Sequence, residues 1–179
     1  MKKLSIVFIS LGLLLISALA QAEWTPDPNN ELELSVQKSI LEAKSKDDSL
    51  SKWFDSAYAY AVFPSIGKGG FVIGGAGGKG LVIRGDEAVA YTSMSQVSIG
   101  LQAGGQVYAE YIMFKDKTAF DHFARGNFEM GAQVSAVAVT AGASADADYD
   151  GGVAVFTLAG GGLMFEASVA GQKFKYKAK

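Results

Sequence analysis

The sequence predicts an α+β domain: N-terminal helices, then an antiparallel, glycine-rich and strongly curved sheet that tends toward a barrel, with one short intervening helix. Three observations lead to this fold class. Apolar residues recur at helical spacing as far as Pro64, they alternate with polar or small residues beyond it, and glycine becomes frequent from Gly67 onward. Strands and helices do not alternate regularly, which argues against a doubly wound nucleotide-binding fold.

The N-terminus has the three parts of a secretory signal peptide. A basic start, "MKK", precedes the apolar run "LSIVFISLGLLLISALA", and Ala20 and Ala22 place small residues before a cleavage site. We expect cleavage near Ala22 and a periplasmic or secreted protein; an uncleaved anchor is the alternative, since the run is marginal for a span of about 20 residues. The chain has no cysteine, which excludes a lipoprotein anchor, disulfides and thiolate metal sites.

After the leader we expect a polar lead over residues 23–30 and a single domain over residues 31–179, long enough to bury a core. Without Lys2 and Lys3 of the leader, the 16 basic residues fall to 14 against 18 acidic ones, a net charge of −4. Such a chain has no overall attraction for nucleic acid or for anionic membranes. Any binding of anionic headgroups therefore requires a local group of lysines.

Three helices are predicted. Asn30, with Glu33 three residues later, resembles a capping box that opens a helix over residues 31–46, where apolar residues follow helical spacing. A second helix is predicted over residues 49–63, ended by Pro64. The short intervening helix lies within residues 115–127, begins at Asp116 and ends at Gly126.

Alternation with a period of two predicts the strands. Within residues 95–108, Val97, Ile99, Leu101 and Ala103 point to one face and the residues between them to the other. Residues 131–142 and 161–171 have the same pattern. These segments supply the antiparallel sheet.

Residues 67–85 contain nine glycines and two lysines. Gly75, Gly77 and Gly80 match a dinucleotide-binding pattern, but a strand-like "LVIR" follows where that pattern requires a helix, so we predict no nucleotide site. We expect two strands, Gly70 to Gly74 and Gly80 to Arg84, joined by a glycine turn. Glycine inside strands indicates curvature, or close approach of another backbone or a ligand, and curvature is the favoured explanation.

Other polar groups give weaker signals. Asp146, Asp148 and Asp150 of "DADYDG" resemble the start of a calcium loop, but Thr157 stands at the twelfth position, and a solvated hairpin turn is favoured over calcium. The single histidine, His122, has no nucleophile or metal set around it, and the acidic pair beginning at Asp47 is explained by a solvated turn. We therefore predict no cofactor and no enzyme.

Several blocks, spread over about residues 50–175, resemble the SYLF lipid-binding family in the order in which that family has them. They are an alanine-rich segment ending in Phe-Pro, the glycine-rich strands, a G-x-Q-x-G-x-Q segment and a C-terminal "GGLM". The residues that carry the resemblance are Phe63, Pro64, Gly69, Gly70, Gly74, Gly75, Gly80, Gly100, Gln102, Gly104, Gln106, Gly162 and Leu163.

The resemblance implies a non-enzymatic phospholipid-binding module, with phosphoinositides and actin as partners of eukaryotic members and exported proteins among bacterial ones. We hypothesise a phospholipid-binding module of the bacterial cell envelope that contacts the membrane surface and binds neither nucleotide nor nucleic acid. The alternative is a structural or interaction protein whose glycine-rich sheet packs on a protein partner. The candidate lipid-binding residues are Lys38, Lys44, Lys46, Lys68, Lys79, Trp24 and Trp53.

Overall fold

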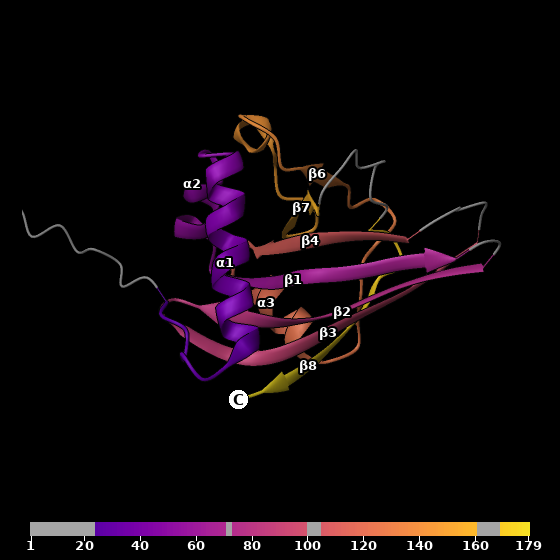
Figure 1. The fold of residues 1–179 in the computed structure, drawn as a ribbon, viewed down its shortest axis with the longest axis horizontal. Helices are drawn as coiled ribbons and strands as arrows, with labels where there is room; N and C mark the ends of the chain where they lie inside the picture. Colours follow the sequence, from indigo (N-terminus) through magenta and orange to yellow (C-terminus); the bar gives the residue numbers. More distant parts are fainter. Residues whose placement is uncertain (1–23, 71–72, 100–104, 161–168) are drawn as a thin grey trace, which may run out of the picture.

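The computed structural model describes residues 24–70, 73–99, 105–160 and 169–179. It consists of one curled sheet with helices on both faces (Figure 1), so the predicted α+β class is confirmed. The helices are α1 (Glu31–Lys46), α2 (Leu50–Ser56), α3 (Lys117–Ala124) and the 3-10 turn η1 (Ala143–Asp146). No helix in the described ranges is long and apolar enough to cross a membrane.

The sheet has eight strands in the order β5-β8-β3-β2-β1-β4-β7-β6. Their bounds are β1 Ala59–Gly70, β2 Ile73–Arg84, β3 Glu87–Ile99, β4 Gly105–Phe114, β5 Phe128–Glu129, β6 Ala136–Ala138, β7 Val153–Ala159 and β8 Lys173–Ala178. All neighbours pair antiparallel except β6 and β7, which are parallel. The sheet is therefore mixed, which corrects the purely antiparallel prediction at its edge. The long strands β1 to β4 extend past the helices (Figure 1).

Both predicted helix starts are confirmed by their caps. The side chain of Asn30 accepts hydrogen bonds from the backbone N–H groups of Leu32 and Glu33, which opens α1. Asp116 accepts from the N–H of Ala119 at the start of α3. Shortly after α3, Gly126 has a φ of +88°, a conformation that favours glycine.

The second predicted helix is too long. It ends at Ser56 rather than at Pro64, and Ala57 already has extended backbone. Residues 59–63 belong to β1, where alternate residues enter the cores on the two faces of the sheet. A segment that is apolar on both faces has no distinctive period, so the pattern could not separate a buried strand from a helix.

Two strand predictions also need correction. The predicted glycine turn between Gly74 and Gly80 is absent, because Ile73–Arg84 is one continuous strand paired with β1 on one side and β3 on the other. The connection between β1 and β2 falls at residues 71–72, outside the described ranges. Of residues 131–142 only Ala136–Ala138 form a strand. Most of the predicted 161–171 strand, and residues 100–104 of the 95–108 segment, also lie outside those ranges.

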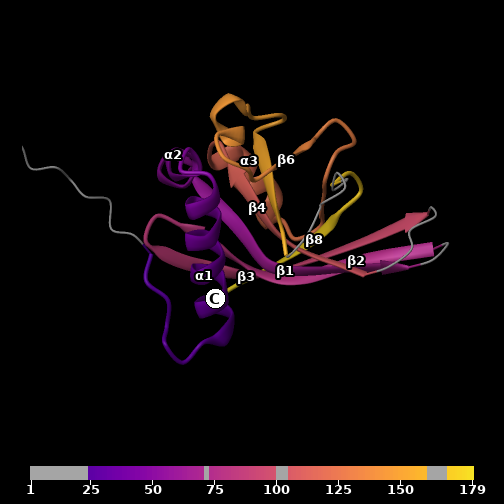
Figure 2. The same cartoon turned by 45° about the horizontal axis from the view of Figure 1, so that its top comes forward.

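A bulge at Pro64 bends the central strand β1. On the β2 side, Phe63 and Pro64 together lie opposite Gly80, and on the β4 side Pro64 and Ser65 together lie opposite Ala109. Proline has no N–H to donate and is tolerated inside a sheet at a bulge, which increases the local twist. Register shifts on both sides of one strand therefore contribute to the strong curl of the sheet (Figure 2).

Two glycines of β2 are required by this bulge. A Cβ atom on Gly80 would lie 2.3 Å from the carbonyl oxygen of Val62, and one on Gly78 would lie 2.7 Å from that of Ser65. Both distances are below any real contact of a Cβ atom. The backbones of β1 and β2 therefore approach too closely here for any other residue.

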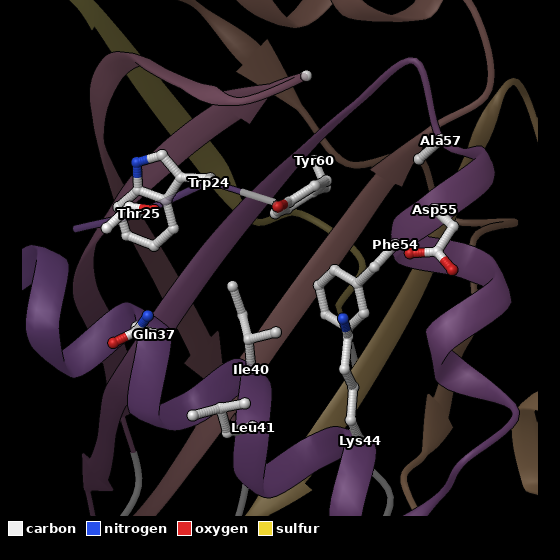
Figure 3. Close-up of a pocket in the computed structure, with 11 residues that line it drawn as sticks. Trp24, Thr25, Gln37, Ile40, Leu41, Lys44, Phe54, Asp55, Ala57 and Tyr60 are labelled. Carbon is white, nitrogen blue, oxygen red and sulfur yellow. The ribbon is translucent and has the colours of Figure 1, made fainter. Parts of the chain in front are cut away.

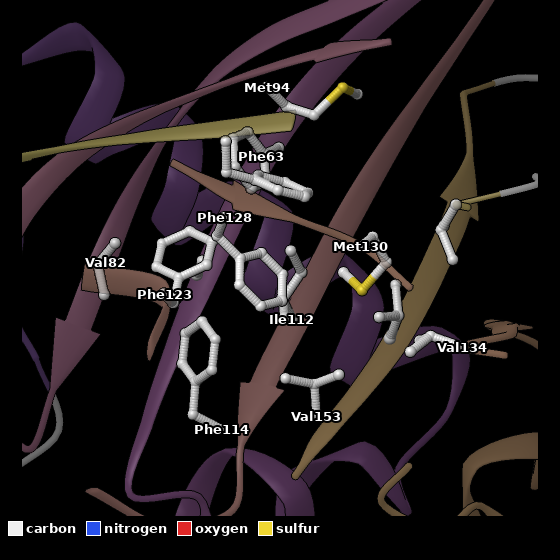
Figure 4. Close-up of a cluster of buried hydrophobic side chains, with 14 of the residues drawn as sticks. Phe63, Val82, Met94, Ile112, Phe114, Phe123, Phe128, Met130, Val134 and Val153 are labelled. Carbon is white, nitrogen blue, oxygen red and sulfur yellow. The ribbon is translucent and has the colours of Figure 1, made fainter. Parts of the chain in front are cut away.

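The two faces of the sheet bury separate cores. The inner core fills the concave side, beneath α3, and is dominated by aromatic rings (Figure 4). Its largest members are Phe63, Ile66, Met94, Tyr108, Ile112, Phe114, Phe120, Phe123, Phe128, Met130 and Phe174. The outer core joins α1 and α2 to the opposite face and includes Val36, Ile40, Leu50, Phe54, Val62, Leu81, Ile83, Tyr111, Met113 and Phe156. Every central strand is thus covered on both faces near the helices.

Asp47, between α1 and α2, is buried rather than solvated, which corrects the turn interpretation. Its carboxylate accepts hydrogen bonds from the backbone N–H groups of Ser49 (3.1 Å), Gly142 (3.2 Å) and Ser144 (2.8 Å). Burial acts to raise the pKa of Asp47, but hydrogen bonds from Ser49 and Ser144 outweigh it and lower the pKa to about 2. The carboxylate therefore holds η1 against the helical corner.

The bulge predicts opposite effects for two glycine substitutions. Gly80→Ala should destabilise the fold by about 2 kcal/mol, because the added methyl group overpacks the contact with Val62. Gly67→Ala should be neutral or stabilise by about 0.5–1 kcal/mol, since no atom lies within 4 Å of its added Cβ and alanine restricts the unfolded chain. Urea unfolding of the two variants checks this, and equal losses would contradict the geometry.

Asp47→Asn should lower the free energy of unfolding by about 2 kcal/mol near neutral pH, because an amide cannot replace a charged acceptor of several hydrogen bonds. The folded-state pKa lies below the unfolded value of 3.8, so the stabilisation is present above that pH and is lost as pH falls towards 2. Denaturant unfolding from pH 7 to pH 2 should show the two proteins converging in acid. A constant difference would mean that the charge of Asp47 is not responsible.

Candidate functional site

Helix α1 lies across the outer face of the sheet and leaves a groove on each of its sides. The first groove, about 330 Å³, lies between α1, α2 and the residues that precede α1 (Figure 3). Trp24, Ile40 and Phe54 form its apolar wall, and Lys44 reaches over the ring of Phe54 at 5.3 Å. Asp55 also lines it. A cation engaged with an aromatic ring beside a carboxylate makes this groove a poor anion site.

The second groove, about 440 Å³, lies on the other side of α1, over the bulge of β1. Its residues come from five elements that are distant in the sequence. They are Leu32, Ser35, Lys38, Ser39 and Glu42 of α1, Pro64 and Ser65 of β1, Lys79 of β2, Val107, Tyr108 and Ala109 of β4, and Leu158 and Ala159 of β7, followed by Gly160. We call this the lysine groove.

Lys38 and Lys79 approach the lysine groove from α1 and from the sheet. Both side chains have no hydrogen bond, ion pair or ring contact within the described ranges, and Lys79 is exposed. Glu42 is the single acidic residue of the lining. Two ammonium groups that form no ion pair in the described part of the chain, against one carboxylate, leave the groove with a net positive charge, in a protein whose overall charge is negative.

The opposite side of the lysine groove is apolar. Val107 is 53% exposed, an unusual position for a valine, and Ala109 and Leu158 form the floor beside it. The hydroxyl of Tyr111 donates to the carbonyl oxygen of Ser39 (2.9 Å) and bonds its side-chain oxygen (2.7 Å), which fixes α1 on β4. The groove is therefore a rigid cleft with cations on one side and hydrocarbon on the other.

Beyond the lysine groove, glycines cover the outer face of β1, β2 and the start of β4, while the neighbouring β3 places Ser95 and the 80% exposed Val97 opposite them. Gly67, Gly69, Gly75, Gly77 and Gly105 lie side by side across β1, β2 and β4 by register, and we call them the glycine face. An added Cβ atom would meet nothing closer than 3.4 Å at any of them. Unlike Gly78 and Gly80 on the inner face, these glycines are not required by the packing of the described chain.

The structure separates the other lysines that were predicted to bind lipid. Lys44 lines the first groove, and Lys46 is exposed at the end of α1 outside both grooves. Lys68 lies opposite Ala76, which packs against the inner core, so it occupies the other face of the sheet from Lys79. The predicted lysines thus do not form one patch; two of the five meet in the lysine groove.

Neither predicted tryptophan anchor presents a free ring. Trp24 is only 6% exposed and belongs to the outer core. Trp53 packs against Tyr149 and Phe156, and its indole N–H donates to the carbonyl oxygen of Ser144 at 2.9 Å. Neither ring is therefore available to anchor the protein at a membrane surface.

The resemblance residues that the structure describes have mainly structural positions. Phe63 and Pro64 form the bulge and Gly80 lies against it, while Gly70 and Gly74 pair with each other beside the β1–β2 connection. Gly69 and Gly75 belong to the glycine face, and Gln106 is exposed at the start of β4. Gly100, Gln102, Gly104, Gly162 and Leu163 lie outside the described ranges.

The described ranges contain no group of three acidic, histidine or cysteine side chains placed to hold a metal ion. Asp146 lies in η1, and Asp150 bridges to Val153 across a turn made by glycines with positive φ. His122 is exposed and meets the ring of Phe128 edge-on at 5.3 Å. We take neither the calcium alternative nor a catalytic role for His122 further.

Sequence reasoning missed most of the lysine groove. Ser35, Ser39, Val107 and Leu158 converge only through the fold, and no spacing within the chain indicates it. Val107 did leave one local signal of an exposed apolar position. It follows glycines at the start of β4, and the later residues of that strand are all buried.

Comparison with known proteins agrees with the resemblance found in the sequence. Residues 95–178 match the model of the Ysc84 family, described as Las17-binding protein actin regulator. The chain is 31% identical over 138 residues to beta cell expansion factor A of Aeromonas veronii, an alignment that covers 76% of this chain and 52% of that protein. The chain thus spans about half the length of this curated relative. From the family match, the curated relative and the sequence blocks together, the chain belongs to the SYLF (Ysc84) family, a family of binding domains.

Proposed function

We propose that this protein is a non-enzymatic phospholipid-binding module of the bacterial cell envelope, and that the lysine groove receives the headgroup. The observation that carries the proposal is the pair of lysines, Lys38 and Lys79, that line one cleft from two different elements and form no ion pair among the described residues. A phosphate between them would form charge-assisted hydrogen bonds with both. The SYLF family membership supports lipid binding as the general class of activity.

The apolar side of the lysine groove explains why the ligand should be a lipid rather than a soluble phosphate. Exposed Val107, with the buried Leu158, offers hydrocarbon in the same groove as the cations, and the glycine face leaves open space next to Val107. A phosphate ester that carries acyl chains satisfies both halves of the cleft. Burying this apolar surface would add to the binding free energy at about 25 cal/mol per Å².

If the predicted signal peptide is cleaved, the protein functions in the periplasm or outside the cell, where anionic phospholipids such as phosphatidylglycerol and cardiolipin are the available headgroups. Actin and phosphoinositides would be absent there, so we do not extend the partners implied by the family description to this chain. Because the net charge of the mature chain opposes anionic surfaces, binding should depend strongly on the groove and weaken as salt screens it.

The double variant Lys38→Ala with Lys79→Ala should bind phosphatidylglycerol vesicles roughly 30-fold more weakly, since each lysine near an anionic surface is worth about 1 kcal/mol. Co-sedimentation of the mature protein with vesicles of phosphatidylglycerol, cardiolipin or phosphatidylethanolamine alone measures this. The matched control is Lys46→Ala with Lys52→Ala, two exposed lysines outside both grooves. Equal losses for both double variants would indicate general charge attraction, and no binding by the wild type would end the lipid proposal.

Ser65→Trp tests the cleft itself without changing charge. Ser65 is exposed and lines the lysine groove, so an indole ring there should occupy the space and reduce vesicle binding at least about tenfold. Thr118→Trp, on an exposed position of α3 outside both grooves, is the control for the added aromatic ring. Unchanged binding by Ser65→Trp, with its melting temperature preserved, would exclude the groove as the lipid site.

The glycine face favours one second candidate, a structural role in which it packs on a protein partner. Among the described residues, Gly67 and Gly69 have no neighbour that excludes a side chain, so their bareness would serve something outside this part of the chain. Gly67→Leu with Gly69→Leu distinguishes the two functions. It should leave headgroup binding to Lys38 and Lys79 largely intact, but would abolish association with a partner that packs flat on this face.

A further inference from the structure

A carboxyl group is buried inside the curl where no cation meets it. Glu110 of β4 has no exposed surface, and by register it lies between Phe63 of β1 and Thr157 of β7. The polar groups at this place are neutral: the hydroxyl of Tyr108 on the same strand and the amide of Gln172, just before β8. In the described ranges no lysine, arginine or histidine contacts Glu110. An ionised carboxylate is very costly in such surroundings.

Gln172 is the direct partner of Glu110. It is also fully buried, and its Nε2 donates to Oε2 of Glu110 at 2.9 Å and lies 3.4 Å from the hydroxyl of Tyr108. One oxygen remains on each partner: Oε1 of Glu110 and Oε1 of Gln172 are buried and have no hydrogen-bond partner among the described residues. The Glu110–Gln172 contact therefore has one unsatisfied oxygen on each of its two side chains.

The two orphaned oxygens have one common solution. If Glu110 were ionised, both would be acceptors, and neither could bond the other. A proton on Glu110 supplies the missing donor, so that the carboxylic acid can donate to the amide oxygen while it accepts from the amide N–H. Leaving both atoms unsatisfied would cost far more than one hydrogen bond contributes. The arrangement therefore fits a neutral acid.

We propose that Glu110 and Gln172 form a proton-dependent clasp that closes the curled sheet. Strand β4 and strand β8 are separated by β3, β2 and β1 in the sheet order, so this contact bridges the inside of the curl. The carbonyl oxygen of Gln172 also accepts from the N–H of Met130 at 2.8 Å, beside β5. The clasp thus ties the edge formed by β5 and β8 to the centre of the sheet. Ionisation of Glu110 removes the donor, places a charge in the core and loosens that edge.

The titration of Glu110 gives the direction of the effect. Burial raises its pKa to about 7, although the hydrogen bond from Gln172 acts the other way. Burial, with the nearby Glu110 charge, also raises the pKa of Tyr108, which therefore stays neutral. Because the folded-state pKa of Glu110 exceeds the unfolded value of 4.5, the stabilisation is full below pH 4.5 and is lost as pH rises through about 7.

The first experiment compares the wild type with Glu110→Gln by thermal unfolding between pH 5 and pH 8. The melting temperature of the wild type should fall relative to that of Glu110→Gln across this range, because glutamine cannot ionise. Glu87→Gln, an exposed change of the same type on β3, should follow the wild type. Parallel curves for the wild type and Glu110→Gln would overturn the proposal.

Two measurements on the wild type keep the proposal testable if Glu110→Gln fails to fold. The carboxyl carbon of Glu110, followed by NMR, should titrate near neutral pH, and an ionised signal at pH 5 would overturn the clasp. Hydrogen exchange of the Met130 and Phe174 amides, corrected for intrinsic rates, should accelerate at pH 8 relative to α1 amides. Stability that instead depends on added Na⁺ or Ca²⁺ would show that a cation, rather than a proton, joins the two oxygens, and would also overturn the proposal.

Discussion

The bulge at Pro64 is the constraint on which the rest of the structure depends. It lies in β1, the strand at the middle of the sheet, and it shifts the register against β2 and β4 at the same point. Proline can occupy this place only because a bulge leaves its nitrogen without a ladder partner. The bulge in turn brings two carbonyl oxygens of β1 so close to β2 that Gly78 and Gly80 become necessary. This bulge therefore contributes strongly to the curl, and two glycines make it sterically possible.

The curl has different consequences on the inner and outer faces of the sheet. On the inside it brings β8 round to face β4, which allows aromatic rings from α3, β5 and β8 to share one core and places Gln172 against Glu110. On the outside it bends the sheet away from straight α1. The helix packs closely on β1, β2 and β4 through the outer core, and the lysine groove opens beside it, directly over the bulge. The bend thus produces both the lysine groove and the clasp. The groove lies over β1 and β4 on the outer face of the sheet, and Glu110 of β4 lies on the inner face.

Local chemistry made part of this fold predictable. The caps at Asn30 and Asp116 and the helical period of residues 31–46 depend on neighbours in the sequence, and the structure confirms them. The change from helix to strand was predicted at Pro64 and occurs earlier, at Ala59. The extent of α2, the continuity of β2 through its glycines and the parallel pairing of β6 depend on strands far away in the chain, and the pattern missed them. The site divides in the same way. The lysines were identifiable by type, but only the fold decides which of them meet. Glu110 did leave a signal, as a single acid within the otherwise apolar "VYAEYIMF".

The glycines of residues 67–85 show how one composition can have two physical causes. On the inner face, Gly78 and Gly80 are required because a Cβ atom would collide with the bulged backbone. On the outer face, Gly67, Gly69 and their neighbours would accept a side chain freely, and each glycine inside a strand costs about 0.5–1 kcal/mol relative to alanine. Curvature therefore accounts for the first set and cannot account for the second. No contact within the described chain offsets the stability that these outer-face glycines cost. The same face adjoins the lysine groove, where Lys38 and Lys79 form no ion pair with a described residue. What remains for the second set is contact with something outside the described chain, and this bare backbone suits a partner that packs flat on the face.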